Sequence, residues 1–164
     1  MTTKQTRRTA NQSGGFDAFL ADVRQRVAAA APGDEGTKRF VLAISDQYAA
    51  VRPQDILVHP LRFLKQAAGN PPVQFGTQGF RKSLVDDDNP ARHYTAFVFI
   101  GFWLPTALAI LVLWAWEILG FLRYGFKWSQ PDIRSGYVGI RHGRAVRQSG
   151  LHVLPDLIVQ DLRD

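Results

Sequence analysis

The chain has 164 residues, a formal net charge of +6 and no cysteine. That length allows one ordinary domain or two small units. The absence of cysteine excludes thiol catalysis, disulfide cross-links and cysteine-bound zinc. A basic balance fits either an anionic binding partner or the flanks of a membrane helix, and a long uncharged segment in this chain favours the second.

Residues 1–15 are predicted to form a flexible basic tail. Lys4, Arg7 and Arg8 are not followed by an apolar core, so the segment does not read as a secretory signal peptide. No aromatic residue accompanies these cations. Nucleic acid is therefore not an expected partner.

Residues 16–68 are predicted to form a small helical unit. Apolar residues follow helical spacing from Phe16, and this first helix is expected to stop before Pro32. A second helix is expected from Thr37 to Arg52, since the residue before a proline is pushed out of the α region. A short third helix is expected in the rest of the unit.

Residues 69–93 are predicted to be a linker, because they are rich in glycine, proline and asparagine. Three consecutive acids, Asp86, Asp87 and Asp88, precede the next segment. They could bind a divalent ion, but a solvated turn is the simpler interpretation.

Residues 94–122 are predicted to form one transmembrane helix. Residues 94–116 contain no charged residue, and as a helix they would span roughly 35 Å, enough to cross a hydrocarbon core of about 30 Å. Pro105 is expected to kink this helix. The residues expected at the membrane interface are Tyr94, Trp114, Trp116, Glu117 and Arg123.

Glu117 is the only acidic residue of this segment, and it has two interpretations. A buried intramembrane carboxylate would be a candidate functional site. We prefer an interfacial charge, because Trp114 and Trp116 are close by and Arg123 lies six residues further on.

Residues 123–164 are predicted to form short β-strands and turns, because glycines punctuate short apolar runs. Arg141, Arg144 and Arg147 would line up on one face of a helix. The glycine-rich context favours strands and turns instead.

Several short motifs occur in this C-terminal segment. They comprise Gly136, Tyr137, Val138 and Gly139, then Gly143, and then Gly150, Leu151 and His152 with Leu154 and Pro155. Following an apolar helix, this arrangement resembles the opening of the stomatin–prohibitin–flotillin family, also called the band 7 family. The resemblance covers the membrane helix and the first strands only. It implies a role in membrane scaffolding or in regulating a membrane protease.

The sequence therefore predicts a mainly α membrane protein with a small N-terminal helical unit, one transmembrane helix and a short C-terminal β segment. The predicted function is a single-pass scaffold of the band 7 type that assembles with itself or with a membrane protein complex. The alternative is an accessory subunit of a larger integral complex, such as a respiratory or secretion assembly. The expected partners are the lipid bilayer and other membrane proteins. The expected location is the bacterial inner membrane, or else the mitochondrial inner membrane, with a cytoplasmic N-terminus.

No catalytic, cofactor-binding or metal site is predicted, and an enzyme is not expected. The four histidines, at positions 59, 93, 142 and 152, have no metal-ligand spacing to a carboxylate. The sequence contains neither a phosphate-binding glycine loop nor a Gly-x-Ser-x-Gly elbow.

Overall fold

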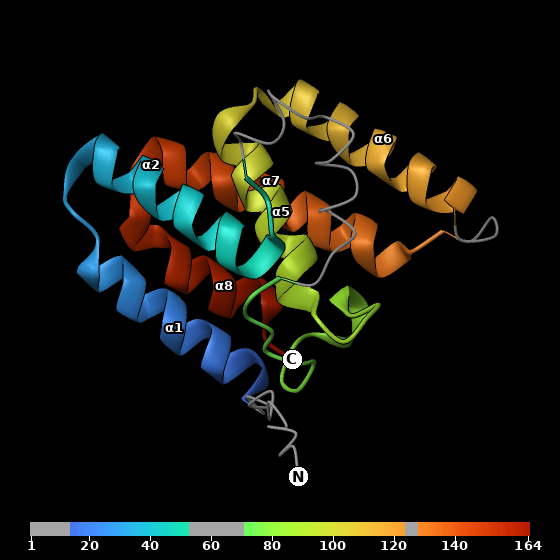
Figure 1. Cartoon of the computed structure of the whole chain (residues 1–164), viewed down its shortest axis with the longest axis horizontal. Coiled ribbons are helices and arrows are strands. Elements are labelled where there is room, and N and C mark those ends of the chain that lie inside the picture. Colours follow the sequence, from blue (N-terminus) through green and yellow to red (C-terminus); the bar gives the residue numbers. More distant parts are fainter. Residues whose placement is uncertain (1–13, 53–70, 124–127) are drawn as a thin grey trace, which may run out of the picture.

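The computed structural model describes residues 14–52, 71–123 and 128–164, and these segments are built from helices (Figure 1). In chain order the elements are α1 (Gly15–Ala29), α2 (Gly33–Ile44), the π-helix η1 (Ser45–Ala49), the 3-10 helix η2 (Lys82–Leu84), α5 (Pro90–Trp103), α6 (Thr106–Arg123), α7 (Gln130–Ser149), the 3-10 helix η3 (Leu151–Val153) and α8 (Leu154–Leu162).

The helices pack around α5, which lies near the middle of the molecule (Figure 1). α2, η1 and α7 all pack against α5, and α8 packs against both α1 and α7. The core that they enclose is rich in aromatic rings. The Phe19 ring makes edge contacts with Phe75 and Tyr94, at centroid distances of 5.3 and 6.0 Å. Each such contact adds about 0.5–1.5 kcal/mol beyond the burial of the rings themselves.

α5 and α7 run side by side in the same direction, and glycines allow their backbones to touch. A Cβ atom at Gly139 would lie 2.5 Å from the carbonyl oxygen of Tyr94, and one at Gly143 would lie 2.1 Å from that of Val98. On the facing helix, a Cβ at Gly101 would lie 2.3 Å from a carbonyl oxygen of α7. Any larger residue at these positions would force the two helices apart.

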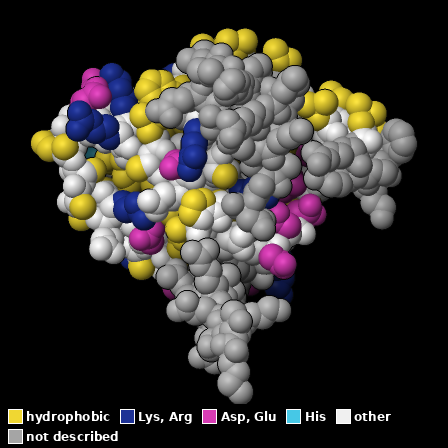
Figure 2. All heavy atoms as spheres, in the orientation of Figure 1, with side chains coloured by type: hydrophobic (Ala, Val, Ile, Leu, Met, Phe, Trp, Pro, Cys, Tyr) yellow, Lys and Arg dark blue, Asp and Glu magenta, His cyan; other side chains and the backbone are white. Residues whose placement is uncertain are grey.

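The predicted transmembrane helix over residues 94–122 is wrong, because the segment is divided between α5 and α6. Leu104 is extended, and Pro105 follows it, so the chain reverses where a kink was expected. Among the helices of the described residues, none combines the length and the apolarity needed to cross a membrane. The predicted membrane fold and membrane location are corrected accordingly. Hydrophobic side chains instead gather at the surface over α6 (Figure 2).

The predicted β segment over residues 123–164 is also wrong, since the described part of it is helical. Ser129 caps α7 by accepting a hydrogen bond from the Asp132 amide (3.1 Å), and Gly150 ends the helix at φ +90°. Within the ranges that the structure describes, extended pairing is limited to one isolated bridge between Phe80 and Arg163.

The N-terminal prediction is closer to the structure. The first expected helix is confirmed as α1, after which the chain turns extended at Ala30. The second begins at Gly33 rather than Thr37, and the π-helix that continues it closes at Ala50 with φ +56°. The third expected helix, and the basic tail up to residue 13, lie outside the described residues. The predicted linker includes η2 and the first residues of α5.

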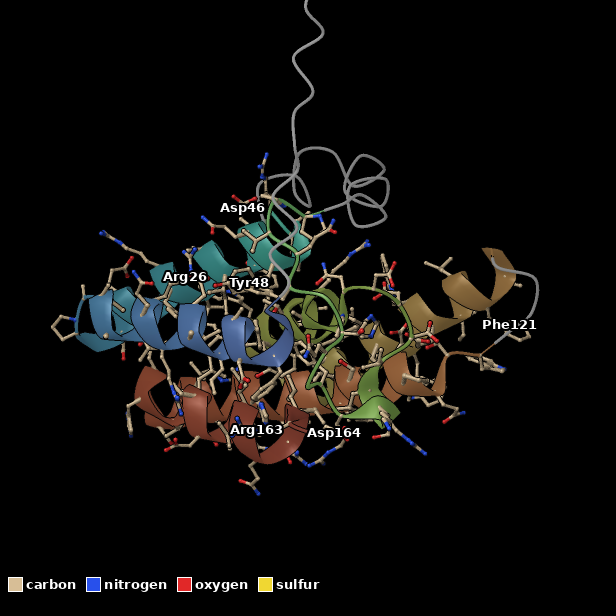
Figure 3. All side chains as sticks on the ribbon, turned by 90° about the horizontal axis from the view of Figure 1, so that it is seen from below. Arg26, Asp46, Tyr48, Phe121, Arg163 and Asp164 are labelled. Atoms are coloured by element: carbon tan, nitrogen blue, oxygen red, sulfur yellow. The ribbon has the colours of Figure 1, made fainter. Side chains whose placement is uncertain are left out.

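α1 is tied to η1 by a polar cluster at the edge of the aromatic core. Arg26 Nε donates to Asp22 Oδ2 (2.8 Å), and its Nη2 donates to Gln47 Oε1 (2.6 Å). The Tyr48 hydroxyl donates to the same carboxylate. The guanidinium of Arg26 also lies 5.5 Å from the centre of the Tyr48 ring, and Figure 3 shows these two side chains close together between the helices.

The contact between α5 and α7 predicts a specific sensitivity to one methyl group. We expect Gly143→Ala to lower the free energy of unfolding by roughly 2–3 kcal/mol, because the new Cβ would collide with the backbone of α5. Gly120→Ala on α6 is the matched control, since its Cβ would meet nothing within 4 Å among the described atoms. That control should be neutral or stabilising by about 0.5–1 kcal/mol, as alanine favours helix. Urea denaturation of both variants measures the difference, and equal effects would contradict close backbone contact.

Candidate metal centre

Three ionisable side chains from three helices meet at one end of the α5–α6–α7 bundle. His93 lies in the first turn of α5, Asp132 lies in the first turn of α7, and Glu117 lies in the last two turns of α6. α5 and α7 run in the same direction, so their first turns lie at the same end of the bundle. α6 runs in the opposite direction, so its last turns return to that end. One ligand atom from each residue can be chosen so that all three lie within 4.8 Å of one another.

The three side chains are close without side-chain hydrogen bonds between them, although the His93 ring interacts with the backbone of Asp132. His93 Nε2 lies 3.8 Å from Glu117 Oε1, and His93 Nδ1 lies 3.9 Å from Asp132 Oδ1. His93 Nε2 is buried and has no hydrogen-bond partner in the described segments. Leaving such a group unpaired costs about 1–3 kcal/mol. The side chain of Glu117 is only 6% exposed, whereas that of Asp132 is 30% exposed, so the cluster opens to solvent beside Asp132.

The electrostatics of the cluster follow from burial and from acidic neighbours. Burial, with the charges of Asp132 and Asp86, raises the pKa of Glu117 from 4.5 to about 7. Burial, with the charges of Asp86 and Asp87, raises the pKa of Asp132 from 3.8 to about 6. Burial lowers the pKa of His93 to about 4, so its ring is neutral at pH 7. His93 therefore gives these carboxylates no positive charge, although Arg92 offsets part of their repulsion.

A second unpaired polar group lies one helical turn from His93. Asn89 precedes α5 and is 7% exposed, and both polar atoms of its side chain are buried without a hydrogen-bond partner among the described residues. Two buried groups with unused hydrogen-bonding capacity at one helix end are unusual in a native fold.

The donor set suits a transition-metal ion. Zinc, manganese and iron accept imidazole nitrogen together with carboxylate oxygen, whereas magnesium and calcium prefer oxygen alone. Ligands about 2.0–2.2 Å from a metal lie roughly 3–4 Å from one another, so the widest separation in this cluster, up to 4.8 Å, would have to shorten by roughly 1 Å to hold an ion. Three protein ligands would leave at least one position for water, on the exposed side.

The predicted interface residues do not form one site. Trp114 is exposed and donates to the Tyr137 hydroxyl (3.0 Å), whereas Trp116 is partly buried against Leu113 and its neighbours. Glu117 is buried among the helices, whereas the sequence analysis placed it either at a membrane interface or inside a membrane. Arg123 ends α6, and its side chain lies outside the described part of the chain.

Tyr94, the remaining predicted interface residue, belongs to the core. Its hydroxyl lies 2.9 Å from His142 Nδ1, and His142 Nε2 lies 2.8 Å from Asp161 Oδ2, which also accepts from Arg141 (2.6 Å). Burial lowers the pKa of His142, so the neutral ring can accept from Tyr94 and donate to Asp161. This chain of hydrogen bonds joins α5, α7 and α8. With His142 fully buried, its role is structural.

The residues of the family-like motif lie in helices instead of strands. Gly136, Tyr137, Val138, Gly139 and Gly143 are part of α7, Gly150 ends it, Leu151 and His152 are in η3, and Leu154 and Pro155 begin α8. The glycines expected to form turns are contact points between helices. A Cβ at Gly136, for example, would lie 2.5 Å from the Leu113 side chain of α6.

Comparison with protein-family models, with curated proteins and with solved structures finds no match for this chain. The resemblance to the band 7 family therefore stays a prediction. The strands on which it was based are not present in the described residues.

The sequence reasoning missed this cluster because its members are far apart along the chain. His93 and Glu117 are 24 positions apart, and Glu117 and Asp132 are 15 apart, so no local ligand spacing exists. Two signals were available. Glu117 was the one acid in an apolar segment, and the helical spacing of the arginines at 141, 144 and 147 indicated the helix that carries Asp132.

The raised pKa of Glu117 predicts a pH-dependent effect of its neutral isostere. The folded chain prefers protonated Glu117, so ionisation of this side chain lowers the free energy of unfolding. The loss is complete above about pH 7 and absent below pH 4.5. We expect Glu117→Gln to be more stable than the unmodified chain by up to about 3 kcal/mol at pH 8 with a chelator present, and by much less at pH 5. Thermal and urea unfolding at both pH values test this.

Glu35→Gln is the control for this experiment, because its side chain is 69% exposed. It should change stability little at either pH. A gain for Glu117→Gln of the same size at pH 5 and pH 8 would show that ionisation of a buried acid is not its cause.

Proposed function

We propose that this chain binds one divalent transition-metal ion through His93, Glu117 and Asp132. The observation that carries the proposal is the convergence of their ligand atoms within 4.8 Å, with the buried His93 Nε2 unpaired in the described structure. Because the His93 ring is neutral, it does not balance the charges of the two acids, and a bound ion would supply that positive charge. It would also link the ends of α5, α6 and α7.

The proposed ion would keep a coordination position towards solvent, because Asp132 is the most exposed of the three ligands. Sites with three protein ligands and a bound water are typical of metals that activate water or polarise a substrate oxygen. This geometry favours metal-dependent chemistry on a small ligand over a purely structural ion. It departs from the sequence-based expectation that the chain is not an enzyme.

Assembly with other proteins is a second proposal, and a different surface supports it. The outer face of α6 exposes large aliphatic side chains, including Leu111 at 64% and Leu122 at 60%. Contiguous apolar patches on a protein surface commonly mark interaction sites. Of the scaffold and accessory-subunit predictions, we propose again only the assembly with other proteins.

The metal proposal predicts binding of about one ion per chain. We expect isothermal titration calorimetry of the metal-free protein with zinc or manganese chloride to give that stoichiometry. At an ion concentration a hundred times the Kd, binding should raise the free energy of unfolding by about 2.7 kcal/mol. His93→Ala, Glu117→Gln and Asp132→Asn should each weaken binding by at least tenfold.

Glu35→Gln serves as the matched control, because it removes an exposed carboxylate from the same chain. It should bind the ion like the unmodified protein. Equal affinity for the control and the three ligand variants would show that the ion binds elsewhere. Absence of binding by any first-row divalent ion would refute the proposal.

A further inference from the structure

Helix α6 is attached to the rest of the molecule along a narrow buried stripe. Among the side chains of α6 that the structure describes, those of Ala109, Leu113 and Glu117 are buried, with exposed fractions of 0%, 0% and 6%. Successive members are four positions apart, so they lie in one line along the helix. In α5, by contrast, nine of the 14 residues are buried. α6 is therefore a peripheral helix that is held along one edge, as its place in Figure 1 agrees.

The hydrophobic part of this attachment is small and separate from the main core. Ala109 and Leu113 pack with Phe97 of α5 and Ile140 of α7 in a cluster of their own. Within the described ranges, the larger core is built from other elements and contains no buried residue of α6. Segments with few buried apolar contacts open at a lower free energy than the core of the same protein.

Other contacts of α6 lie at the surface. Trp114 donates to the Tyr137 hydroxyl, and the two side chains are 38% and 40% exposed. The Phe121 ring stacks on that of Trp128, which is 45% exposed. The net gain from an exposed hydrogen bond is small, because water replaces it when the helix moves. The buried stripe is therefore the main attachment.

The third member of the stripe, Glu117, is a ligand of the proposed ion. Its Oε1 atom lies 3.8 Å from His93 Nε2, which is beyond hydrogen-bonding distance, so this contact holds α6 weakly without an ion. A bound ion would join Glu117 by coordinate bonds to His93 of α5 and Asp132 of α7. Asp132 is partly exposed, whereas Glu117 and His93 Nε2 are buried. An ion therefore meets Asp132 first and reaches the other two ligands when α6 moves.

We propose that α6 is a lid that the bound ion closes. The lid turns about Leu104 and Pro105, where extended backbone separates α5 from α6. When α6 is open, Glu117 is withdrawn and His93 Nε2 is accessible to the ion. Binding then draws α6 onto α5 and α7. This inference rests on the proposed function and adds that occupancy of the metal site controls the position of α6.

The reaction rate of a single introduced cysteine measures the opening, because the chain has no cysteine of its own. In Leu113→Cys the thiol lies on the inner face of α6 and is protected from a thiol reagent until the lid opens. Leu154→Cys is the matched control, since Leu154 is 1% exposed and belongs to the main core. With a chelator present, we expect Leu113→Cys to react at least tenfold faster than Leu154→Cys. Equal rates would show that α6 does not open independently and would overturn the lid.

Manganese chloride tests the closure, because manganese prefers carboxylate oxygen to thiolate and so avoids the introduced cysteine. At an ion concentration a hundred times the Kd, the reaction of Leu113→Cys should slow by up to about a hundredfold. Adding Glu117→Gln to Leu113→Cys should remove this slowing, since the ion would no longer be linked to α6. Slowing that persists in the double variant would overturn the role of Glu117 as the link.

Calorimetry on the same variants separates failure of the lid from failure of the metal site. If manganese binds to Leu113→Cys without slowing its reaction, the lid is overturned and the metal site stands. If manganese does not bind, the proposed function fails for this ion and closure of the lid fails with it.

Discussion

The close contact between α5 and α7 is the constraint on which the rest of the structure depends. With glycines at positions 101, 139 and 143, the two helices meet backbone to backbone, and their direction and register are fixed by that meeting. α6 must then cover the end and flank of this pair, and α1, α2 and α8 must pack around it. Because this backbone contact depends on the absence of side chains at the glycines, a small shift of neighbouring side chains cannot make room for a larger residue. A methyl group at one contact displaces a whole helix.

The same register brings the ionisable cluster together. Parallel packing puts the first turns of α5 and α7 at one end, where His93 faces Asp132, and the returning α6 delivers Glu117 to them. The fold therefore buries Glu117 and partly buries Asp132 beside a neutral histidine, at a cost in stability. Native proteins keep such costs mainly where the groups are used, and this is the physical reason for connecting the cluster with function.

Local patterns in the sequence predict only part of this arrangement. The spacing of apolar residues after Phe16 predicts α1, and Pro105 indicates a distortion of the apolar segment. What local patterns do not contain is the partner of each helix. Glycines at 136, 139 and 143 disfavour a helix when considered alone, and only the surface of α5 makes them favourable. For the same reason the uncharged run of residues 94–116 suggested one long helix, whereas in the folded chain it is divided between α5 and α6. The cluster at His93 is a product of this packing and could not be derived before it.

The hydrogen bonds around Phe80 and Arg163 have a consequence for the order in which the molecule is built. The Asp164 amide donates to the Gly79 carbonyl, the Arg81 amide donates to the Leu162 carbonyl, and Arg163 forms an ion pair with Asp17. On the ribosome, α1 emerges long before the residues that cover its first turn are made. Its aromatic side chains can pack on Phe75 and Phe80 once these are made, whereas its ion pair with Arg163 forms last. The link between the start of α1 and the end of α8 therefore closes only after the rest of the core has been synthesised.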